Sequence, residues 1–212
     1  LPELDRPVAS VGIGRNGILN IERESGLSGS IHDKGVYIIS GFLISRFGSQ
    51  APLSLDASVC FEQSYTEIDG DSASSTEIYA LLSCLADIPL NQGIAVTGSV
   101  NQQGDIQPIG GINHKIEGFF DICRARGLTG SQGVIIPHGN LPHLMLNEEL
   151  VEAVRRKRFS VFAVSTVDEG MEILTGVQAG KADKRGVYPP GTINRLVTEK
   201  LHKMAEALRD FR

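Results

Sequence analysis

Strict alternation of apolar and polar residues over 53–62 constrains the fold of this chain more than any other sequence feature. Every second residue there is leucine, alanine, valine or phenylalanine, and the residues between them are serine, cysteine or acidic. A period of two is typical of a strand that buries one face. Shorter strands are expected at 93–100, 106–108, 133–137 and 160–167. Because helical segments separate these strands, the sequence predicts an α/β domain that ends near Gly176.

Apolar residues spaced by three and four predict helices over 33–47, from about Ser72 to Pro89, from Gly111 to Gly127, and over 147–158. The last of these helices begins with acidic residues and ends with the basic run 155–158. We interpret that run as complementing the helix dipole, and a nucleic-acid contact is the alternative.

The N-terminal segment contains the letters of a dinucleotide-binding fingerprint, G-x-G-x-x-G, over 12–17. That fingerprint requires a helix that begins at the glycines. Here a short apolar run leads directly into the turn-like segment 25–29. Asn16-Gly17 between two apolar runs therefore favours a β-hairpin over 8–22, and a nucleotide site is the alternative.

The tail differs from the rest of the chain in charge. Residues 181–212 hold eight basic and four acidic side chains, although the whole chain has a net charge of −5. Apolar residues step by four and three along Val197, Leu201, Met204, Leu208 and Phe211. We therefore expect a domain over 1–176 and a tail over 177–212 that ends in an amphipathic helix. The helix is expected to dock on its own body, with a neighbouring subunit as the alternative.

Composition excludes several classes of protein. The acidic balance argues against a main role in nucleic-acid binding. No run of about 18 apolar residues could span a membrane, and the first residues lack the order of a signal peptide. Cys60, Cys84 and Cys123 are far apart and are interpreted as buried free thiols of a cytoplasmic protein. The histidines lack H-E-x-x-H spacing and a P-loop is absent, so no metal is expected.

Ser72 stands where acyl-transfer chemistry is possible. It follows the polar segment 69–71 and begins a predicted helix, where free backbone N–H groups can hold an oxyanion. Gly70 beside it would let a carbonyl group approach the backbone closely. Serine is also a common N-cap, and Ser74 with Glu77 has capping-box spacing. The pattern alone favours the cap.

A serine nucleophile needs a base, and Lys115 is the candidate. On a helical wheel it lies at the border of the apolar stripe formed by Ile112, Ile116 and Phe119. Burial lowers the pKa of a lysine, and a base would need a pKa near roughly 7–8 instead of about 10.4. A lysine whose stem merely covers apolar surface is the alternative, and His114, a rival base, points away from the stripe.

Two linked segments resemble the Lon protease family. Asp69-Gly70-Asp71-Ser72-Ala73-Ser74 is similar to the nucleophile motif of the B-type Lon enzymes. Residues 95–100 and 108–115 are similar to the segment that carries the family's catalytic lysine. Residues 133–137, followed by Asn140, match the next family strand and its loop. The resemblance extends from about Gly29 to Gly176, with Asn113-His114 replacing the charged residues often found before the lysine.

The resemblance implies a compact Lon-type proteolytic domain of short mixed strands and packed helices. It implies a serine endopeptidase that hydrolyses peptide bonds of unfolded proteins or peptides through a Ser72–Lys115 dyad. Backbone N–H groups of Asp71 and Ser72 would hold the oxyanion, and the Thr97 hydroxyl would orient the lysine. If Asp69 reaches the lysine ammonium, it would raise the lysine pKa and act as a resting latch.

The family couples this domain to an AAA+ ATPase, and 212 residues are too few to contain both. ATP and Mg²⁺ would belong to that missing part, so no cofactor is expected in this chain. The resemblance further implies a cytoplasmic homo-hexamer, with no membrane contact and no role for this domain in nucleic-acid binding. The length suggests that the chain begins at a domain boundary within a longer protein. A catalytically silent α/β assembly or binding module is the alternative function.

Overall fold

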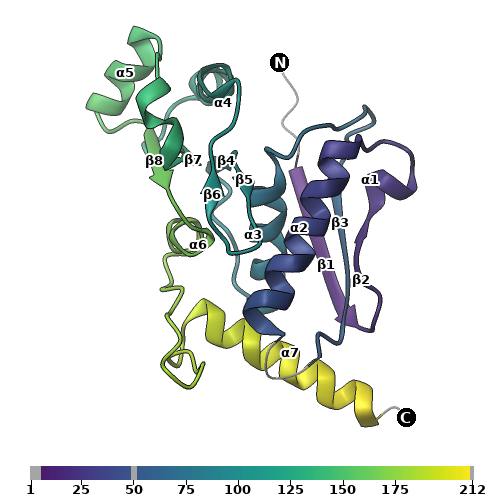
Figure 1. Cartoon of the computed structure of the whole chain (residues 1–212). Coiled ribbons are helices and arrows are strands. Elements are labelled where there is room, and N and C mark those ends of the chain that lie inside the picture. The colour runs from purple at the N-terminus through teal and green to yellow at the C-terminus, as the bar shows by residue number, and fades with distance from the viewer. Residues whose placement is uncertain (1–5, 49–51, 211–212) are drawn as a thin grey trace.

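The computed structural model describes residues 6–48 and 52–210. Its N-terminal sheet is built around β3 (Leu55–Glu62), the strand that the alternating pattern predicts. Strand β1 (Arg6–Ile13) pairs with one edge of β3 in antiparallel register, and β2 (Gly17–Asn20) pairs with the other edge in parallel register (Figure 1). Alternate side chains of β3 are buried from Leu55 to Phe61, as expected of a strand with one core-facing side.

The hairpin expected at Asn16-Gly17 is wrong. β1 and β2 do not pair with each other, because β3 lies between them and forms hydrogen bonds with both. Asn16 is held by β3 as well, since its backbone N–H and its side-chain amide donate to the Asp56 carboxylate at 2.7 and 2.9 Å. Only a one-turn helix, α1 (Ile21–Glu24), follows β2.

The second sheet contains three parallel strands in the order β4 (Ile94–Val96), β7 (Gly133–Pro137) and β8 (Ser160–Val164). The single strand expected over 93–100 is divided into β4 and β5 (Ser99–Val100), and β5 pairs with β6 (Ile106–Gln107) in a separate ribbon. The division occurs because Gly98 bonds to the turn before α3 instead of to the sheet.

The longer helices agree with the sequence periodicity. They are α2 (Ser30–Phe47), α3 (Ser74–Ala86), α4 (Ile112–Arg126), α5 (Glu148–Arg155) and α7 (Ile193–Asp210). Two further elements, the 3₁₀ helix η1 (His138–His143) and α6 (Val167–Thr175), are not predicted. The strand expected to reach Val167 ends at Val164, because Thr166 caps α6 with its side chain.

Helix α3 is central to the main core and is almost entirely buried. It contacts β1, α2, α6 and α7, and Figure 1 shows α7 running below α2 and α3. Val197, Leu201 and Met204 of α7 are buried in that core, so in this structure the tail helix packs on the body of its own chain. Leu208 is half-buried, and Phe211 lies outside the described residues.

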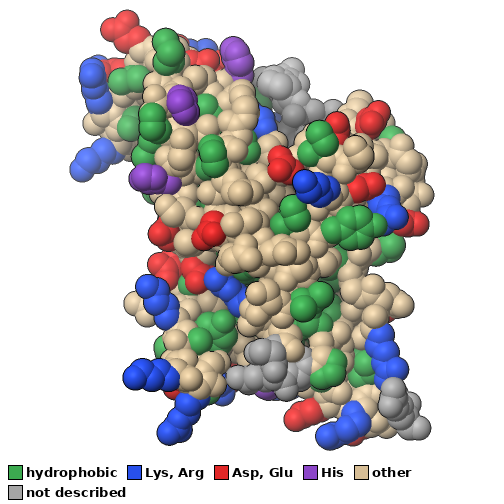
Figure 2. Space-filling view, viewed as in Figure 1, with side chains coloured by type: hydrophobic (Ala, Val, Ile, Leu, Met, Phe, Trp, Pro, Cys, Tyr) green, Lys and Arg blue, Asp and Glu red, His purple; other side chains and the backbone are tan. Residues whose placement is uncertain are grey.

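A second apolar cluster joins α4 and α5 to β7, centred on Ile116, Phe120 and Phe159. The active-site candidates therefore lie where two cores meet. On the face seen in Figure 2, acidic and basic side chains are interspersed with apolar ones. No helix in the described part of the chain is long and apolar enough to cross a membrane.

Candidate active site

Ser72 lies in the turn immediately before α3, two residues ahead of the helix start. Its carbonyl oxygen accepts the N–H of Gly98 at 2.8 Å, and the N–H of Ser75 donates to the Gly98 carbonyl at 3.1 Å. These two bonds fix the turn to the chain that leaves β4. A Cβ added at Gly98 would lie 3.1 Å from Ile106 and 3.3 Å from Pro137, which is tighter than ordinary contact, so the turn and β4 approach closely at this glycine.

Lys115 reaches Ser72 from the first turns of α4. Its Nζ donates to Ser72 Oγ at 2.7 Å and to Thr97 Oγ1 at 3.4 Å. Thr97 Oγ1 in turn donates to the Ser72 carbonyl oxygen at 3.4 Å. The structure thus brings together Ser72, Lys115 and Thr97, three of the residues singled out in the sequence, and places Lys115 rather than His114 within hydrogen-bond distance of Ser72.

The surroundings of Lys115 lower its pKa. The side chain as a whole opens onto a groove, yet the lost hydration of its ammonium lowers the pKa of Lys115 from its ordinary value. The negative charge of Asp71 opposes that effect and raises the pKa, but desolvation is larger. A lysine that loses its proton more readily can accept the proton of a neighbouring hydroxyl.

The two acidic residues before Ser72 have different partners. The Asp71 carboxylate accepts the Ser99 hydroxyl at 2.8 Å and is the acid whose charge acts on Lys115. The Asp69 carboxylate accepts the N–H of Ile31 at 3.3 Å, in the first turn of α2. First-turn N–H groups have no acceptor within their own helix, which explains this contact. The structure therefore places Asp69 on α2 and not on Lys115, so the expected latch is not formed here.

The turn also contains backbone N–H groups that are not used in hydrogen bonds between described residues. The N–H of Ser74 is used within the turn, donating to the Asp71 carbonyl at 3.0 Å. Within the described part of the chain, the N–H groups of Asp71 and Ser72 have no protein acceptor. Gly70, at φ +92°, gives the approach to this turn a backbone conformation that side-chain-bearing residues rarely adopt.

A groove of about 610 Å³ opens around Ser72, Thr97 and Lys115. Its walls come mainly from α3, β4 and α4, with residues of β1 and β7, and are mostly small or apolar apart from a few polar residues such as Arg6. They include Ala73, Thr76, Ala80, Val96, Gly118, Phe119, Ile122 and Val134. The sequence does not predict these groove walls, because an apolar residue that lines a groove has the same helical spacing as one in the core. Such a surface suits a peptide segment with uncharged side chains.

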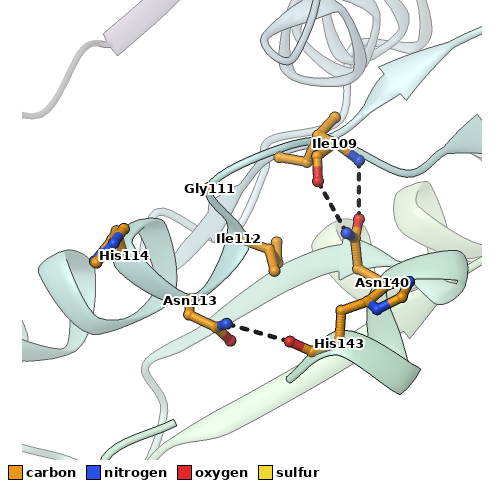
Figure 3. A pocket seen from close by; sticks show the side chains of 7 residues that line it. All are labelled: Ile109, Gly111, Ile112, Asn113, His114, Asn140 and His143. Atoms are coloured by element: carbon orange, nitrogen blue, oxygen red, sulfur yellow. Dashed lines mark hydrogen bonds between the residues drawn. The ribbon is translucent and has the colours of Figure 1, made fainter. Parts of the chain in front are cut away.

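A smaller cavity of about 340 Å³ lies beside the start of α4 (Figure 3). Buried Asn140 spans it, accepting the Ile109 N–H at 3.0 Å and donating to the Ile109 carbonyl at 2.9 Å. Asn113 repeats this arrangement, since it donates to the His143 carbonyl at 3.2 Å and accepts the Met145 N–H at 2.9 Å. The two amides therefore fasten the helix that carries Lys115 to η1 and the segment after it.

The described residues contain no group of three histidine, cysteine or acidic side chains that could hold a metal ion. The three cysteines are free; Cys123 is buried, and Cys60 and Cys84 are half-buried.

Comparison with known proteins agrees with this arrangement. Residues 55–176 match the family described as the Lon protease (S16) C-terminal proteolytic domain. A protein of Escherichia coli (strain K12), named as a Lon protease homolog, is 52% identical over 164 residues, which cover 77% of this chain and 28% of the relative.

A similarly named protein of Haemophilus influenzae is 40% identical over 199 residues, covering 94% of this chain and 33% of the relative. An archaeal Lon protease of Pyrococcus abyssi is 29% identical over 183 residues, which cover 84% of this chain and 17% of the relative. The chain spans about a third or less of the length of these relatives. From the family match and the shared sequence, the chain belongs to the Lon protease proteolytic-domain family.

Proposed function

We propose that this chain is a serine endopeptidase in which Ser72 and Lys115 form the catalytic dyad. One observation carries the proposal. The Lys115 amine lies 2.7 Å from the Ser72 hydroxyl, although 43 positions separate the two residues in sequence. A nucleophile within hydrogen-bond reach of a base is the basic requirement of covalent catalysis. Thr97 supports it as the third group, because its hydroxyl contacts both the lysine amine and the Ser72 carbonyl.

The chemistry follows from these positions. The neutral Lys115 amine takes the proton from Ser72 Oγ as that oxygen attacks the peptide carbonyl carbon. The oxyanion that forms is held by the N–H groups of Asp71 and Ser72. The lysine ammonium then gives its proton to the leaving amine, which leaves an ester on Ser72. Water, deprotonated by the same amine, hydrolyses that ester and restores the serine.

The substrates we propose are unfolded proteins or peptides. An extended segment could lie along the groove, whose apolar walls would accept uncharged side chains. Because the chain spans a third or less of its relatives, we further propose that it works in the cytoplasm with an AAA+ ATPase domain. That domain would bind ATP and Mg²⁺ and deliver substrate to a homo-hexamer of proteolytic domains.

The test is hydrolysis of casein and of a fluorogenic peptide by the wild type, Ser72→Ala and Lys115→Ala. We expect each variant to lose about 10³-fold or more of kcat, because the dyad acts as a unit. His202→Gln, a substitution on the distant helix α7, is the control and should retain the wild-type rate. Equal rates in all four proteins would leave the silent assembly or binding module as the better account.

A further inference from the structure

A buried network of polar side chains links α2 to the start of α3, outside the groove. His32 of α2 and Glu77 of α3 are each 1% exposed, and His32 Nε2 lies 3.0 Å from Glu77 Oε1. The other ring nitrogen, His32 Nδ1, lies 2.8 Å from the Ser28 hydroxyl. That hydroxyl donates to the Asp33 carboxylate at 2.6 Å. The proposed mechanism uses none of these groups.

The donors and acceptors in this network determine the protonation of His32. A serine hydroxyl has one hydrogen, and an ionised carboxylate can only accept. Because Ser28 gives its hydrogen to Asp33, its oxygen must accept from His32 Nδ1–H. The Glu77 carboxylate must likewise accept from Nε2–H. With the Asp33 and Glu77 carboxylates ionised, both ring nitrogens are donors, and this pattern of contacts favours an imidazolium cation paired with Glu77.

The surrounding charges agree with a cation at this position. Burial lowers the pKa of His32, but the hydrogen bond and charge of Glu77, with the charges of Glu22 and Asp33, outweigh it and raise the pKa above its ordinary value. Glu22 of α1 is 5% exposed, and one of its oxygens accepts the Phe61 N–H at 2.7 Å.

The remaining neighbours of His32 come from α1 and β3. Arg23 lies 3.8 Å from the Asp33 carboxylate. The ring of Phe61 meets the imidazole edge-on at 5.8 Å. Cys60 of β3 stays a neutral thiol, since burial and then the charges of Glu22 and Glu62 raise its pKa. Arg23 thus faces Asp33 rather than the imidazole.

The same end of α2 supports the loop that carries Ser72. The N–H of Gly29 donates to the Ile68 carbonyl at 2.8 Å, and the N–H of Ile68 donates to the Leu27 carbonyl at 2.8 Å. Asp69 accepts from the first turn of α2, as described above. A Cβ at Gly35 would lie 3.6 Å from Ser74, so α2 and the turn are in close contact there.

Glu77 connects the start of α2 to the turn that carries Ser72. It lies in the first turn of α3, and its N–H donates to the carbonyl of Ala73, the residue after Ser72, at 3.1 Å. The second carboxylate oxygen of Glu77 is buried without a partner, so His32 is the one group that compensates its charge in the described residues. A buried charge that loses its partner is strongly destabilising.

We infer that His32, as a cation, is a positioning residue for Ser72: by holding Glu77 it keeps the first turn of α3 against α2, and so keeps the Ser72 hydroxyl at the Lys115 amine. The inference rests on the proposed peptidase function. His32 touches neither the dyad nor the groove, so it acts through the position of α3. Loss of its charge leaves Glu77 unpaired and loosens the turn, while the groove walls on β4 and α4 stay in place.

The test uses His32→Gln, Glu77→Gln and the double variant, with His202→Gln as the matched histidine control. For His32→Gln we expect kcat for a fluorogenic peptide to fall roughly 10- to 100-fold, with KM within about twofold of the wild type. A displacement of the Ser72 hydroxyl by about 1 Å is enough to lower kcat by that factor. The double variant leaves no unpaired buried charge and should recover most of that loss. Where His32→Gln does not fold, Glu77→Gln takes its place as the variant that breaks the pair, and the same fall in kcat is expected.

The pH dependence separates positioning from general damage. Wild-type His32 loses its proton as pH rises through its folded-state pKa, so the ratio of wild-type to His32→Gln kcat should fall towards one over that range. A constant ratio, or a His32→Gln enzyme with unchanged kcat, would overturn the inference while Ser72-dependent hydrolysis upheld the proposed function.

A measurement that needs no peptidase activity tests the charge itself. Long-range ¹H–¹⁵N NMR of the wild-type chain at pH 6.5 should show both His32 ring nitrogens protonated. A neutral imidazole at that pH would overturn the inference whatever the activity. Wild-type hydrolysis that persists in Ser72→Ala would instead refute the proposed function, so the two failures are distinguishable.

Discussion

The two halves of the proposed dyad are held in place by different chemistry. The Ser72 turn rests on α2 and α3 through the buried contact between His32 and Glu77, which we infer to be an ion pair. The helix that carries Lys115 is fastened by the side-chain amides of Asn113 and Asn140, which carry no charge at any ordinary pH. The nucleophile side should therefore respond to pH through its support, and the base side only through Lys115 itself.

A first prediction concerns Gly98, at the joint between the two halves. Gly98→Ala adds a Cβ 3.1 Å from Ile106 and 3.3 Å from the Ser75 hydroxyl, which is tighter than ordinary contact. The Ile106, Pro137 and Ser75 side chains must yield by a few tenths of an ångström, and because Ser75 bonds the Ser72 turn to Gly98, kcat should fall by up to about 10-fold. Gly12→Ala is the control, since its nearest neighbour would lie at 3.8 Å. Equal peptide hydrolysis by the two variants would show that the joint does not set the geometry.

A second prediction concerns the support of the base side. Asn140→Ala leaves the N–H and carbonyl of Ile109 without their partners, which should lower the free energy of unfolding by about 1–3 kcal/mol. Urea denaturation at pH 6 and pH 8 measures this loss. Because an amide does not titrate, the loss should be the same at both values, and a loss confined to one pH would contradict the comparison.

The support of the nucleophile side should behave in the opposite way. The pKa of His32 is raised in the folded chain, so its stabilising contribution is fully present below the unfolded value near 6.5 and is lost as pH rises through the folded value. The difference in unfolding free energy between wild type and His32→Gln should narrow over that interval. Denaturant titrations across pH 6–9 would reveal a constant difference if the pair were not ionic.

The smallest effect concerns the pH at which the base becomes active. Activity should rise with pH through the folded-state pKa of Lys115, and Asp71 raises that pKa. Asp71→Asn should therefore move the rising limb of kcat to lower pH, by less than about one unit for a single partly screened charge. Asp69→Asn is the matched control, because Asp69 contacts α2. A shift in the control instead would support the latch that the structure does not form.

Periodicity predicted the elements but not their partners. The alternation over 53–62 identified β3, and the apolar spacing identified α2 and α7, because burial on one face leaves a regular signal. The hairpin failed because a strand's pattern does not say which strand lies beside it. The division of the expected strand 93–100 at Gly98 was not predicted for a similar reason, since it depends on hydrogen bonds to a turn that lies 26 residues earlier in the chain.

The candidate site was predicted from resemblance rather than from physical pattern. Ser72 looked like a helix cap and Lys115 like a border lysine until the two motifs were taken together. The pair of His32 and Glu77 was missed, although His32 stands four residues before Val36 on the apolar stripe of α2. A histidine in that position was the available signal, and its partner, 45 residues away, left none.

The measurement that tests the account most directly is peptide hydrolysis by Lys115→Arg beside the wild type. Arginine keeps the positive charge and much of the length of lysine, but it does not lose its proton in proteins. If Lys115 is the base for Ser72, kcat should fall by about 10³-fold or more, as for Lys115→Ala, while the chain stays folded. A Lys115→Arg enzyme that retained the wild-type rate and pH profile would contradict the dyad.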